Sequence, residues 1–198
     1  MIKFINISEE APYKVFNELY RESVDVNQNN IEAVCIASSS AFNHEVNARF
    51  VNLKFVNEKE FIFFSNYNSP KAKDFISNNH IAAVIYWNSI NVQIRMKALI
   101  NKVSEDFNKN YFAKRDIKKN ALAISSDQSK FINSYEQVEE NFKQTMKNSN
   151  LTECPEYWGG YSFTPYSFEF WRGHESRLNK RELYVLENNI WSHSFLQP

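Results

Sequence analysis

Basic side chains occur in four groups along the sequence, among strand-like residues or beside hydroxyl and amide groups. The groups are Arg49 with Lys54, Ser69 with Lys71, Arg177 with Arg181, and the set of Tyr111, Arg115, Gln128 and Ser129. Arginine combined with serine, glutamine and tyrosine is a donor set suited to phosphate. Each basic residue taken alone is more simply interpreted as a solvated surface charge. The residue types therefore leave phosphate binding and plain solvation both open.

The small number of glycines limits how a phosphate could be held. The chain has three glycines, at positions 159, 160 and 173, and no pair has the spacing of a P-loop or a dinucleotide-binding fingerprint. Average usage would give roughly 7% glycine. A phosphate would therefore need arginine, lysine, serine and glutamine side chains, or the N-terminus of a helix, instead of a glycine-rich loop.

Cysteine and histidine usage predicts neither a metal site nor a disulfide. Cys35 lies in the apolar run 33–37 and is expected in the core, whereas Cys154 precedes Pro155 in a polar loop. Two cysteines do not make a structural zinc site, and the four histidines lack a spacing such as H-x-x-x-H. We therefore expect a protein without a metal ion.

Charge and composition exclude several classes of protein. The 23 basic and 23 acidic side chains give no net charge and a pI near 6.9, so nucleic acid and anionic membranes are not expected partners. A hydrophobic content of 43% excludes disorder, and no apolar run approaches the roughly 18 residues of a membrane span. The first residues lack the long apolar stretch of a signal peptide, which predicts a cytoplasmic protein.

The elements that must position the basic groups are mostly strands. Residues 12–20 have an amphipathic pattern typical of a helix, and Ser69 with Pro70 begins a second helix. Helical patterns also follow Ser104 and Ser134. The strand-like runs are 31–37, 49–56, 60–65, 81–87, 91–103, 158–164, 167–171, 182–186 and 190–195. This order predicts a mainly β, α+β fold in which an antiparallel sheet or barrel lies apart from the helices.

No repeat and no Pro/Gly/Ser-rich linker divides the sequence, so we expect one domain over residues 1–198. Within it, residues 1–30 form a helix and a loop, and residues 157–198 form a C-terminal region rich in strands. The run 91–103 alternates between apolar residues and the polar Gln93 and Arg95. That alternation predicts one face in the core and the other at a site or an interface.

The order and spacing of several short motifs resemble the pyridoxamine 5′-phosphate oxidase family. Residues 49–54 resemble the family's R-x-V-x-L-K, and residues 61–71 resemble its F-x-F-Y-T-N-x-x-S-R-K. The further matching stretches are 93–96, 111–115, 128–129, 158–161 (W-G-G-Y), 169–173 (E-F-W-R-G), 177–181 (R-L-N-K-R) and the ending 196–198. Several motifs in one order are more specific than any single motif, and they cover about residues 31–198.

The resemblance implies a six-stranded antiparallel FMN-binding split β-barrel with peripheral helices, and an obligate homodimer with two FMN molecules at its interface. The residues that match family positions for the FMN phosphate and ribityl chain are Arg49, Lys71, Gln128 and Ser129. Those that match positions around the rest of FMN are Phe64, Ser65, Gln93, Trp171, Arg181 and the backbone of 49–54, Lys54 included. The side chains that match the clamp on the substrate phosphate are Lys54, Tyr111 and Arg115.

Arg177 matches the arginine that reaches over the substrate from the partner subunit, and with Asn179 it occupies the expected catalytic position. Three departures from the family pattern bear on function. Pro70 replaces an arginine near the FMN phosphate, and Lys119 replaces a serine of the substrate-phosphate clamp, where lysine can bind phosphate as a point charge. Asn179 replaces the histidine of R-L-H-[DE]-R, and Lys180 reverses the neighbouring charge. An amide forms hydrogen bonds but does not titrate near neutrality as imidazole does.

Three functions stay open at this point. The first is an FMN-dependent oxidase that converts pyridoxine or pyridoxamine 5′-phosphate to pyridoxal 5′-phosphate with molecular oxygen. Lys54, Tyr111, Arg115 and Arg177 favour it, because all four serve a phosphorylated substrate in the family. The second is a split-barrel flavoenzyme with another substrate, such as the related oxidases of phenazine pathways. The third is a non-catalytic protein that binds FMN or pyridoxal phosphate, and Asn179 favours the second and third.

Overall fold

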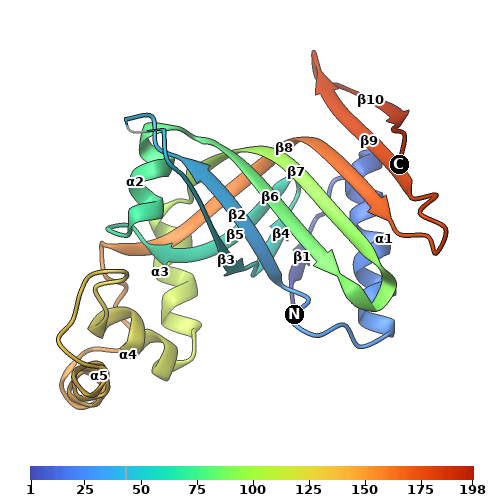
Figure 1. Ribbon diagram of the computed structural model, residues 1–198. Helices are drawn as coiled ribbons and strands as arrows, with labels where there is room; N and C mark the ends of the chain where they lie inside the picture. The colour runs from blue at the N-terminus through green and yellow to red at the C-terminus, as the bar shows by residue number, and fades with distance from the viewer. Residues whose placement is uncertain (43) are drawn as a thin grey trace.

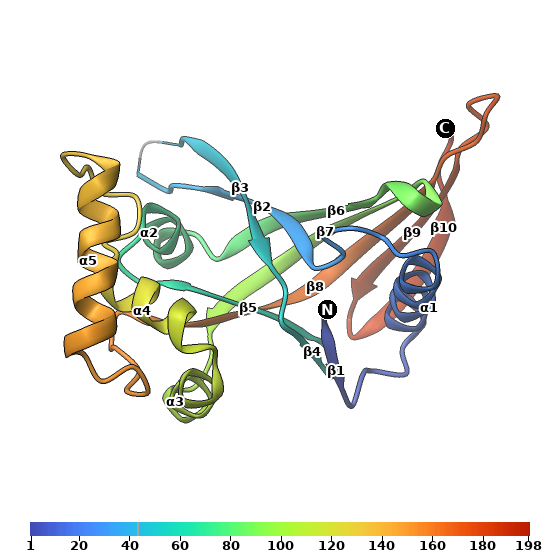
Figure 2. The ribbon, with the colours of Figure 1, turned by 90° about the horizontal axis from the view of Figure 1, so that it is seen from below.

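Ten strands and five α-helices are assigned in the computed structural model, which describes residues 1–42 and 44–198 (Figures 1 and 2). The strands are β1 (Lys3–Ile5), β2 (Ala33–Ser39), β3 (Val46–Asn52), β4 (Phe55–Asn57), β5 (Glu60–Asn66), β6 (His80–Trp87), β7 (Val92–Lys102), β8 (Trp158–Arg172), β9 (Lys180–Glu187) and β10 (Ile190–Phe195). The helices are α1 (Ala11–Asp25), α2 (Pro70–Ser77), α3 (Glu105–Lys114), α4 (Ile117–Ser125) and α5 (Tyr135–Asn148). The predicted mainly β, α+β architecture is confirmed.

The strands form one sheet that curls into half of a barrel. Across the described residues its order is β1-β4-β5-β8-β7-β6-β2-β3, with β9 on the second half of β8 and β10 on β9. Paired strands run antiparallel, except that β1 runs parallel to β4. The sheet therefore has ten strands in the described part of the chain rather than the expected six, and it is not purely antiparallel. Residues 3–5 add an edge strand, and the predicted run 49–56 divides into two strands.

The connection between β3 and β4 closes the curled sheet. Leu53 N donates to Glu32 O at 2.8 Å, whereas Lys54 N donates to Ile62 O of β5 at 2.8 Å. The backbone thus changes its pairing partner within the predicted run 49–56, and β3 and β4 lie toward opposite ends of the strand order. Both halves of the run favour β-structure, so this change depends on tertiary pairing.

Aromatic side chains fill the interior of the curled sheet. The ring centroid of Phe16 on α1 lies 4.9 Å from that of Phe61 and 5.7 Å from that of Trp87. Phe61 in turn stacks on Phe163 at 5.2 Å, and all four side chains are buried. Burial of such large apolar surfaces fixes α1 across one end of the sheet, where a helix was predicted over 12–20.

The two predicted runs 158–164 and 167–171 are one continuous strand, β8. Lys97 of β7 pairs with Ser167, and the next residue of β7 pairs with Pro165, so Tyr166 is an extra residue on β8. A proline is tolerated at such a bulge, where the regular ladder is interrupted. The proline therefore marks an irregularity in the strand and not its end.

The helices divide between the two ends of the sheet. Figures 1 and 2 show α2, α3, α4 and α5 at one end, and α1 with the β9–β10 hairpin at the other. The second helix begins at Pro70 after Ser69, as predicted, although the Ser69 hydroxyl donates to Asn66 O at 2.7 Å instead of capping the helix. Among the described residues, no helix is long and apolar enough to cross a membrane.

Candidate functional site

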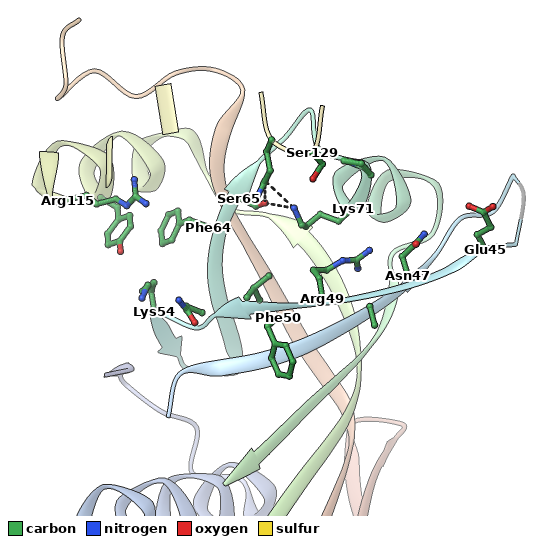
Figure 3. A pocket seen from close by; sticks show the side chains of 16 residues that line it. Glu45, Asn47, Arg49, Phe50, Lys54, Phe64, Ser65, Lys71, Arg115 and Ser129 are labelled. Carbon is green, nitrogen blue, oxygen red and sulfur yellow. Dashed lines mark hydrogen bonds between the residues drawn. The ribbon is translucent and has the colours of Figure 1, made fainter. Parts of the chain in front are cut away.

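A cavity of about 710 Å³ lies where β3 separates from β5, and the first turn of α2 and one face of α3 border it (Figure 3). Its lining residues are Glu45, Asn47, Ala48, Arg49, Phe50, Val51, Asn52, Lys54, Phe64, Ser65, Pro70, Lys71, Tyr111, Arg115, Gln128 and Ser129. The predicted site residues among them are Arg49, Lys54, Phe64, Ser65, Lys71, Tyr111, Arg115, Gln128 and Ser129. Lys119 lines a neighbouring cavity of about 230 Å³ that shares several of these residues.

Lys71 forms one end of the cavity and donates to three neutral oxygens. Its Nζ lies 3.2 Å from Ser65 Oγ, 3.2 Å from Ser69 Oγ and 3.1 Å from Gln128 Oε1. Lys71 is only 8% exposed. Burial, together with the nearby charge of Arg49, lowers the pKa of Lys71 to about 8. An ammonium group in this setting lacks a counter-charge among these partners, and an anionic ligand would supply one.

Arg49 faces Lys71 from β3, as Figure 3 shows. Its Nη1 donates to Ser38 Oγ at 2.7 Å and to Ile36 O at 3.2 Å. Its Nη2 lies 3.6 Å from the Asp74 carboxylate. Burial lowers the pKa of Arg49, and the charge of Asp74 opposes that effect, so the guanidinium stays protonated at neutral pH.

A second basic group consists of Lys54 and Arg115 at the other end of the cavity, with Lys119 close by in the smaller neighbouring cavity. Burial lowers the pKa of Lys54; Glu32 acts in the opposite direction, and Lys119 and Arg115 lower the pKa further. Arg115 Nη1 donates to Lys119 O at 2.8 Å and to Asn120 Oδ1 at 3.1 Å, which fixes the guanidinium beside Lys54. Cations held this close repel one another, and an anion bound between them would relieve the repulsion.

An aromatic wall separates the two basic groups. The ring of Phe64 on β5 stacks on Tyr111 of α3 at 4.0 Å and on Trp158 of β8 at 5.0 Å. Arg115 Cζ lies 5.0 Å from the centroid of the Trp158 ring, a cation–π contact. Trp158 is buried, whereas Phe64 and Tyr111 line the cavity. The stacked rings offer a flat apolar surface next to the two basic groups.

Gln93, Trp171 and Arg181 do not line this cavity in the described structure. Trp171 of β8 pairs with Gln93 of β7 on one side and with Arg181 of β9 on the other, so the three side chains form a row on one face of the sheet. Arg181 is ion-paired with Glu169, which also binds Arg95 Nη1 at 3.0 Å. This row lies at the end of the sheet opposite α2 (Figure 1).

Arg177 and Asn179 lie in the connection between β8 and β9, also away from the cavity in the described structure. The Asn179 Oδ1 accepts from His174 N at 3.1 Å, so this amide shapes the loop that carries Arg177. Arg177 has a φ of 60°, and Ser129 in the cavity has a φ of 67°. This left-handed conformation costs a non-glycine residue roughly 1–2 kcal/mol, and such strain occurs often at functional sites.

The sequence analysis missed the residues that support Arg49, namely Asp74 and Ser38. Asp74 follows Lys71 by three positions and therefore lies on the same face of a helix, a spacing that the sequence does contain. Ser38 lies two positions after Ile36 on β2, on the same face as that core residue. Glu45, which precedes β3, and Asn47 on β3 were also missed, although Asn47 shares the face of Arg49 by strand alternation.

The arrangement can hold two anionic groups at a distance from each other with a flat molecule between them. Arg49, Lys71, Ser65 and Gln128 supply the charged and neutral donors that a phosphate monoester accepts, so this end fits the FMN phosphate that the family resemblance implies. These donors are all side chains.

The sequence of the chain matches known protein families. A family profile described as "Pyridoxamine 5′-phosphate oxidase" matches residues 22–145. The chain belongs to the pyridoxamine 5′-phosphate oxidase family. A second profile, described as "Pyridoxine 5′-phosphate oxidase C-terminal dimerisation region", matches residues 158–198. The predicted family membership is confirmed, and the C-terminal match begins with β8.

Several relatives of known description resemble the chain over nearly its whole length. A pyridoxine/pyridoxamine 5′-phosphate oxidase of Crocosphaera subtropica is 32% identical over 195 residues, which cover 96% of this chain and 91% of that protein. One of Rhodopirellula baltica is 32% identical over 200 residues, with coverages of 98% and 90%. Family and relatives alike are oxidases, so the chain is an oxidoreductase of this type.

Solved structures share the fold. PhzG from Burkholderia lata 383, crystallised with tetrahydrophenazine-1-carboxylic acid, has a TM-score of 0.89 at 19% identity and covers 94% of this chain and 92% of its own. An FMN-binding protein related to pyridoxamine 5′-phosphate oxidase, from Nostoc punctiforme, has a TM-score of 0.79 at 13% identity, with coverages of 96% and 100%. The predicted split-barrel fold class is thereby confirmed.

Proposed function

We propose that the protein catalyses the FMN-dependent oxidation of pyridoxine or pyridoxamine 5′-phosphate to pyridoxal 5′-phosphate, with molecular oxygen as electron acceptor. The observation that carries the proposal is the presence of two separate basic groups at the two ends of one cavity, with an aromatic wall between them. Two phosphorylated molecules placed side by side would use both groups. The relatives named as pyridoxine/pyridoxamine 5′-phosphate oxidases support this choice of substrate.

The FMN phosphate and ribityl chain would lie at the Lys71 end. Arg49 and Lys71 would supply the positive charge, and Gln128 and Ser129 would supply neutral hydrogen bonds. Phe64, Ser65 and the backbone of 49–54 would hold the remainder of the cofactor. When bound, the flavin supplies the two-electron oxidation of the substrate carbon, and the protein supplies binding and orientation.

The substrate phosphate would lie at the other end, against Lys54, Tyr111 and Arg115. Lys119 adds a further cation near this group, where its charge favours a phosphate dianion. Anchoring the phosphate at a fixed distance from the flavin restricts the substrate to orientations in which the reacting carbon approaches the ring. The charges of this chain therefore act on the position of the substrate.

We further propose that the protein is a homodimer whose sites use both chains, and that residues 1–198 form one domain. Gln93, Trp171 and Arg181 lie at the end of the sheet opposite the cavity, in one chain, and Arg177 and Asn179 follow β8 at that end. A second copy could bring these residues to the cavity, and the match of residues 158–198 to a dimerisation region supports this arrangement. The balanced charge is consistent with small-molecule partners and with a cytoplasmic location.

Flavin reduction provides the test. The purified protein loaded with FMN is mixed anaerobically with pyridoxamine 5′-phosphate, and the flavin absorbance is followed. We expect the absorbance to bleach and to return on admission of oxygen, with pyridoxal 5′-phosphate formed. Bound FMN that never bleaches would contradict the oxidase and would favour a flavoenzyme with another substrate, such as a phenazine-type oxidase, or a protein that only binds FMN. Pyridoxamine without its phosphate is the matched control, since it lacks the group that Lys54 and Arg115 would hold.

A further inference from the structure

A buried carboxylate, Asp74, lies next to Arg49 and is not among the residues that line the cavity. We propose that Asp74, acting with Ser38, is a positioning residue that holds the Arg49 guanidinium in place for the phosphate of FMN. The inference rests on the proposed function, because it takes Arg49 as a contact of that phosphate. The inference goes beyond the proposed function because it assigns roles to Asp74 and Ser38, which do not themselves line the cavity.

The contacts form a closed chain. Ser38 Oγ donates to Asp74 Oδ2 at 2.8 Å, and Arg49 Nη1 donates to Ser38 Oγ at 2.7 Å and to Ile36 O at 3.2 Å. Arg49 Nη2 lies 3.6 Å from the same oxygen of Asp74. Ser38 is 2% exposed and Asp74 is 8% exposed, so water does not compete freely for these bonds.

These contacts use only part of the guanidinium. Arginine has five N–H groups in a fixed plane, of which two are on Nη1, two on Nη2 and one on Nε. Among the described residues, the bonds of Nη1 occupy both of its hydrogens, and Asp74 faces Nη2. Within residues 1–42 and 44–198, no described contact uses the Nε–H or the second Nη2–H, and both could bind a ligand. A plane that is fixed along one edge presents the other edge in a single orientation, which lowers the entropic cost of binding phosphate.

Asp74 also offsets charge between two cations. Arg49 is one of the causes that lower the pKa of Lys71, so the two cations interact across the cavity. Asp74 raises the pKa of Arg49 and opposes the effect of burial on it. Lys71 and Asp74 lie three residues apart on the buried face of α2. One short helix therefore supplies a cation to the cavity and the carboxylate that holds the opposite cation, and it sets the distance between the two.

A purely structural role for Asp74 makes a different prediction. The carboxylate also ties α2 to β2 through Ser38, so its loss could loosen the cavity as a whole. Loosening would weaken every flavin ligand, with or without a phosphate, and would do so whether or not Arg49 is present. A positioning role acts through Arg49 and through the phosphate alone.

The experiment is a double-mutant cycle on FMN binding, measured by quenching of FMN fluorescence in the full-length protein. The variants are Asp74→Asn, Arg49→Ala and the combination, with Asp25→Asn at the exposed end of α1 as a matched control. Riboflavin, which lacks the phosphate, serves as the second probe. Thermal unfolding of each variant reports whether the protein stays folded.

We expect Asp74→Asn to weaken FMN binding about tenfold, the lower end of what loss of an outer-shell partner costs in metal sites. In the Arg49→Ala background the same change should have no weakening effect, or should improve binding, since the unpaired carboxylate would otherwise repel the phosphate. Riboflavin binding should not change. If Asp74→Asn unfolds the protein, Ser38→Ala breaks the same chain of contacts, and a threefold or larger loss specific to FMN is expected.

Equal weakening of FMN binding by Asp74→Asn in both backgrounds, or parallel loss of riboflavin, would overturn the positioning role. An unchanged FMN affinity in Asp74→Asn, when Arg49→Ala weakens FMN binding, would also overturn the positioning role. In that case the proposed function stands. A parent protein that does not bind FMN at all would overturn the proposed function and this inference together.

Discussion

Two regions of the molecule differ in how their basic side chains are paired. One is the cavity between β3 and β5, and the other is the row of residues on β7, β8 and β9. In the cavity, Lys71 has neutral partners, and Arg49 keeps two N–H groups that no described residue takes up. In the row, Arg181 donates to Glu169 Oε1 through Nε and Nη2, at 2.9 and 2.8 Å, and to Gln197 O at 2.9 Å. The first region has donors to spare for an anion, whereas the second has already matched its charge.

This difference indicates what each region is built for. A buried cation with neutral partners, such as Lys71, is costly unless a ligand compensates its charge, and the proposed anion site would do so. Matched charges fix the shape of a surface, and the guanidinium of Arg181 is held by the buried Glu169. A surface of fixed shape is what a second copy of the chain would need to meet. In the proposed homodimer, the two regions would be halves of one site that belong to different subunits.

Subunit complementation tests whether the cavity and the row act together from different subunits. We expect Lys54→Ala and Arg177→Ala each to abolish most oxidase activity, because each removes a charge that acts on the substrate. In an exchanged mixture, half of the dimers would be mixed and each would contain one intact site. About a quarter of the parental activity should therefore return, as expected for a two-fold symmetric dimer with shared sites. Absence of recovery, with subunit exchange shown by mass spectrometry, would place both regions in one subunit.

The pH dependence of FMN binding tests whether Lys71 faces the FMN phosphate. The pKa of Lys71 is about 8 without ligand, and a bound phosphate dianion would raise it because opposite charges favour the protonated form. Binding above pH 8 must then take up a proton, so affinity should fall with rising pH, by about fivefold between pH 8 and pH 9. Fluorescence titrations across this range would measure it.

Two controls isolate Lys71. Riboflavin carries no phosphate and should show no comparable loss between pH 8 and pH 9. The Lys71→Met variant should bind FMN more weakly but without this slope, because it lacks the titrating group. An FMN affinity that stays flat in the parent would show that Lys71 does not face the phosphate.

The smallest expected effect concerns Asn179 in the other region. Its amide accepts from His174 N and so supports the loop that carries Arg177. A histidine would keep an acceptor for this bond and add an imidazole donor. One extra hydrogen bond is worth about 0.5–1.5 kcal/mol, so Asn179→His should speed flavin reduction by pyridoxamine 5′-phosphate by about two- to tenfold. Asn179→Ala should slow it. A rate unchanged by both substitutions would remove Asn179 from the reaction.

Local patterns in the sequence predicted the elements well where one residue type or one period decides the structure. The alternation of residues 91–103 is typical of a strand with two different faces, and β7 has that form. Ser69 and Pro70 correctly marked the start of α2. The site residues came from family motifs, because the residue types alone were equally consistent with solvated charges.

What could not be predicted depends on contacts between distant segments. The change of partner at Leu53 and Lys54 follows from pairing with Glu32 and Ile62. The support of Arg49 by Asp74 requires that β3 and α2 meet, and their separation along the chain does not reveal this. A buried acid three residues after a buried lysine is a signal that could have been noticed, although its partner could not have been named.

The link between Leu53 and Lys54 has a consequence for folding. Because one residue pairs toward β2 and the next toward β5, the cavity forms only when the two ends of the strand order have met. Partly folded chains in which the sheet has not closed would contain each basic residue but no site. A ligand that spans the cavity would bind the native state alone and would raise the free energy of unfolding with its concentration, by about 2.7 kcal/mol at 100 times Kd. If FMN is that ligand, as proposed, it would complete the packing of the closed sheet. Cells short of flavin would then contain a protein that unfolds more readily.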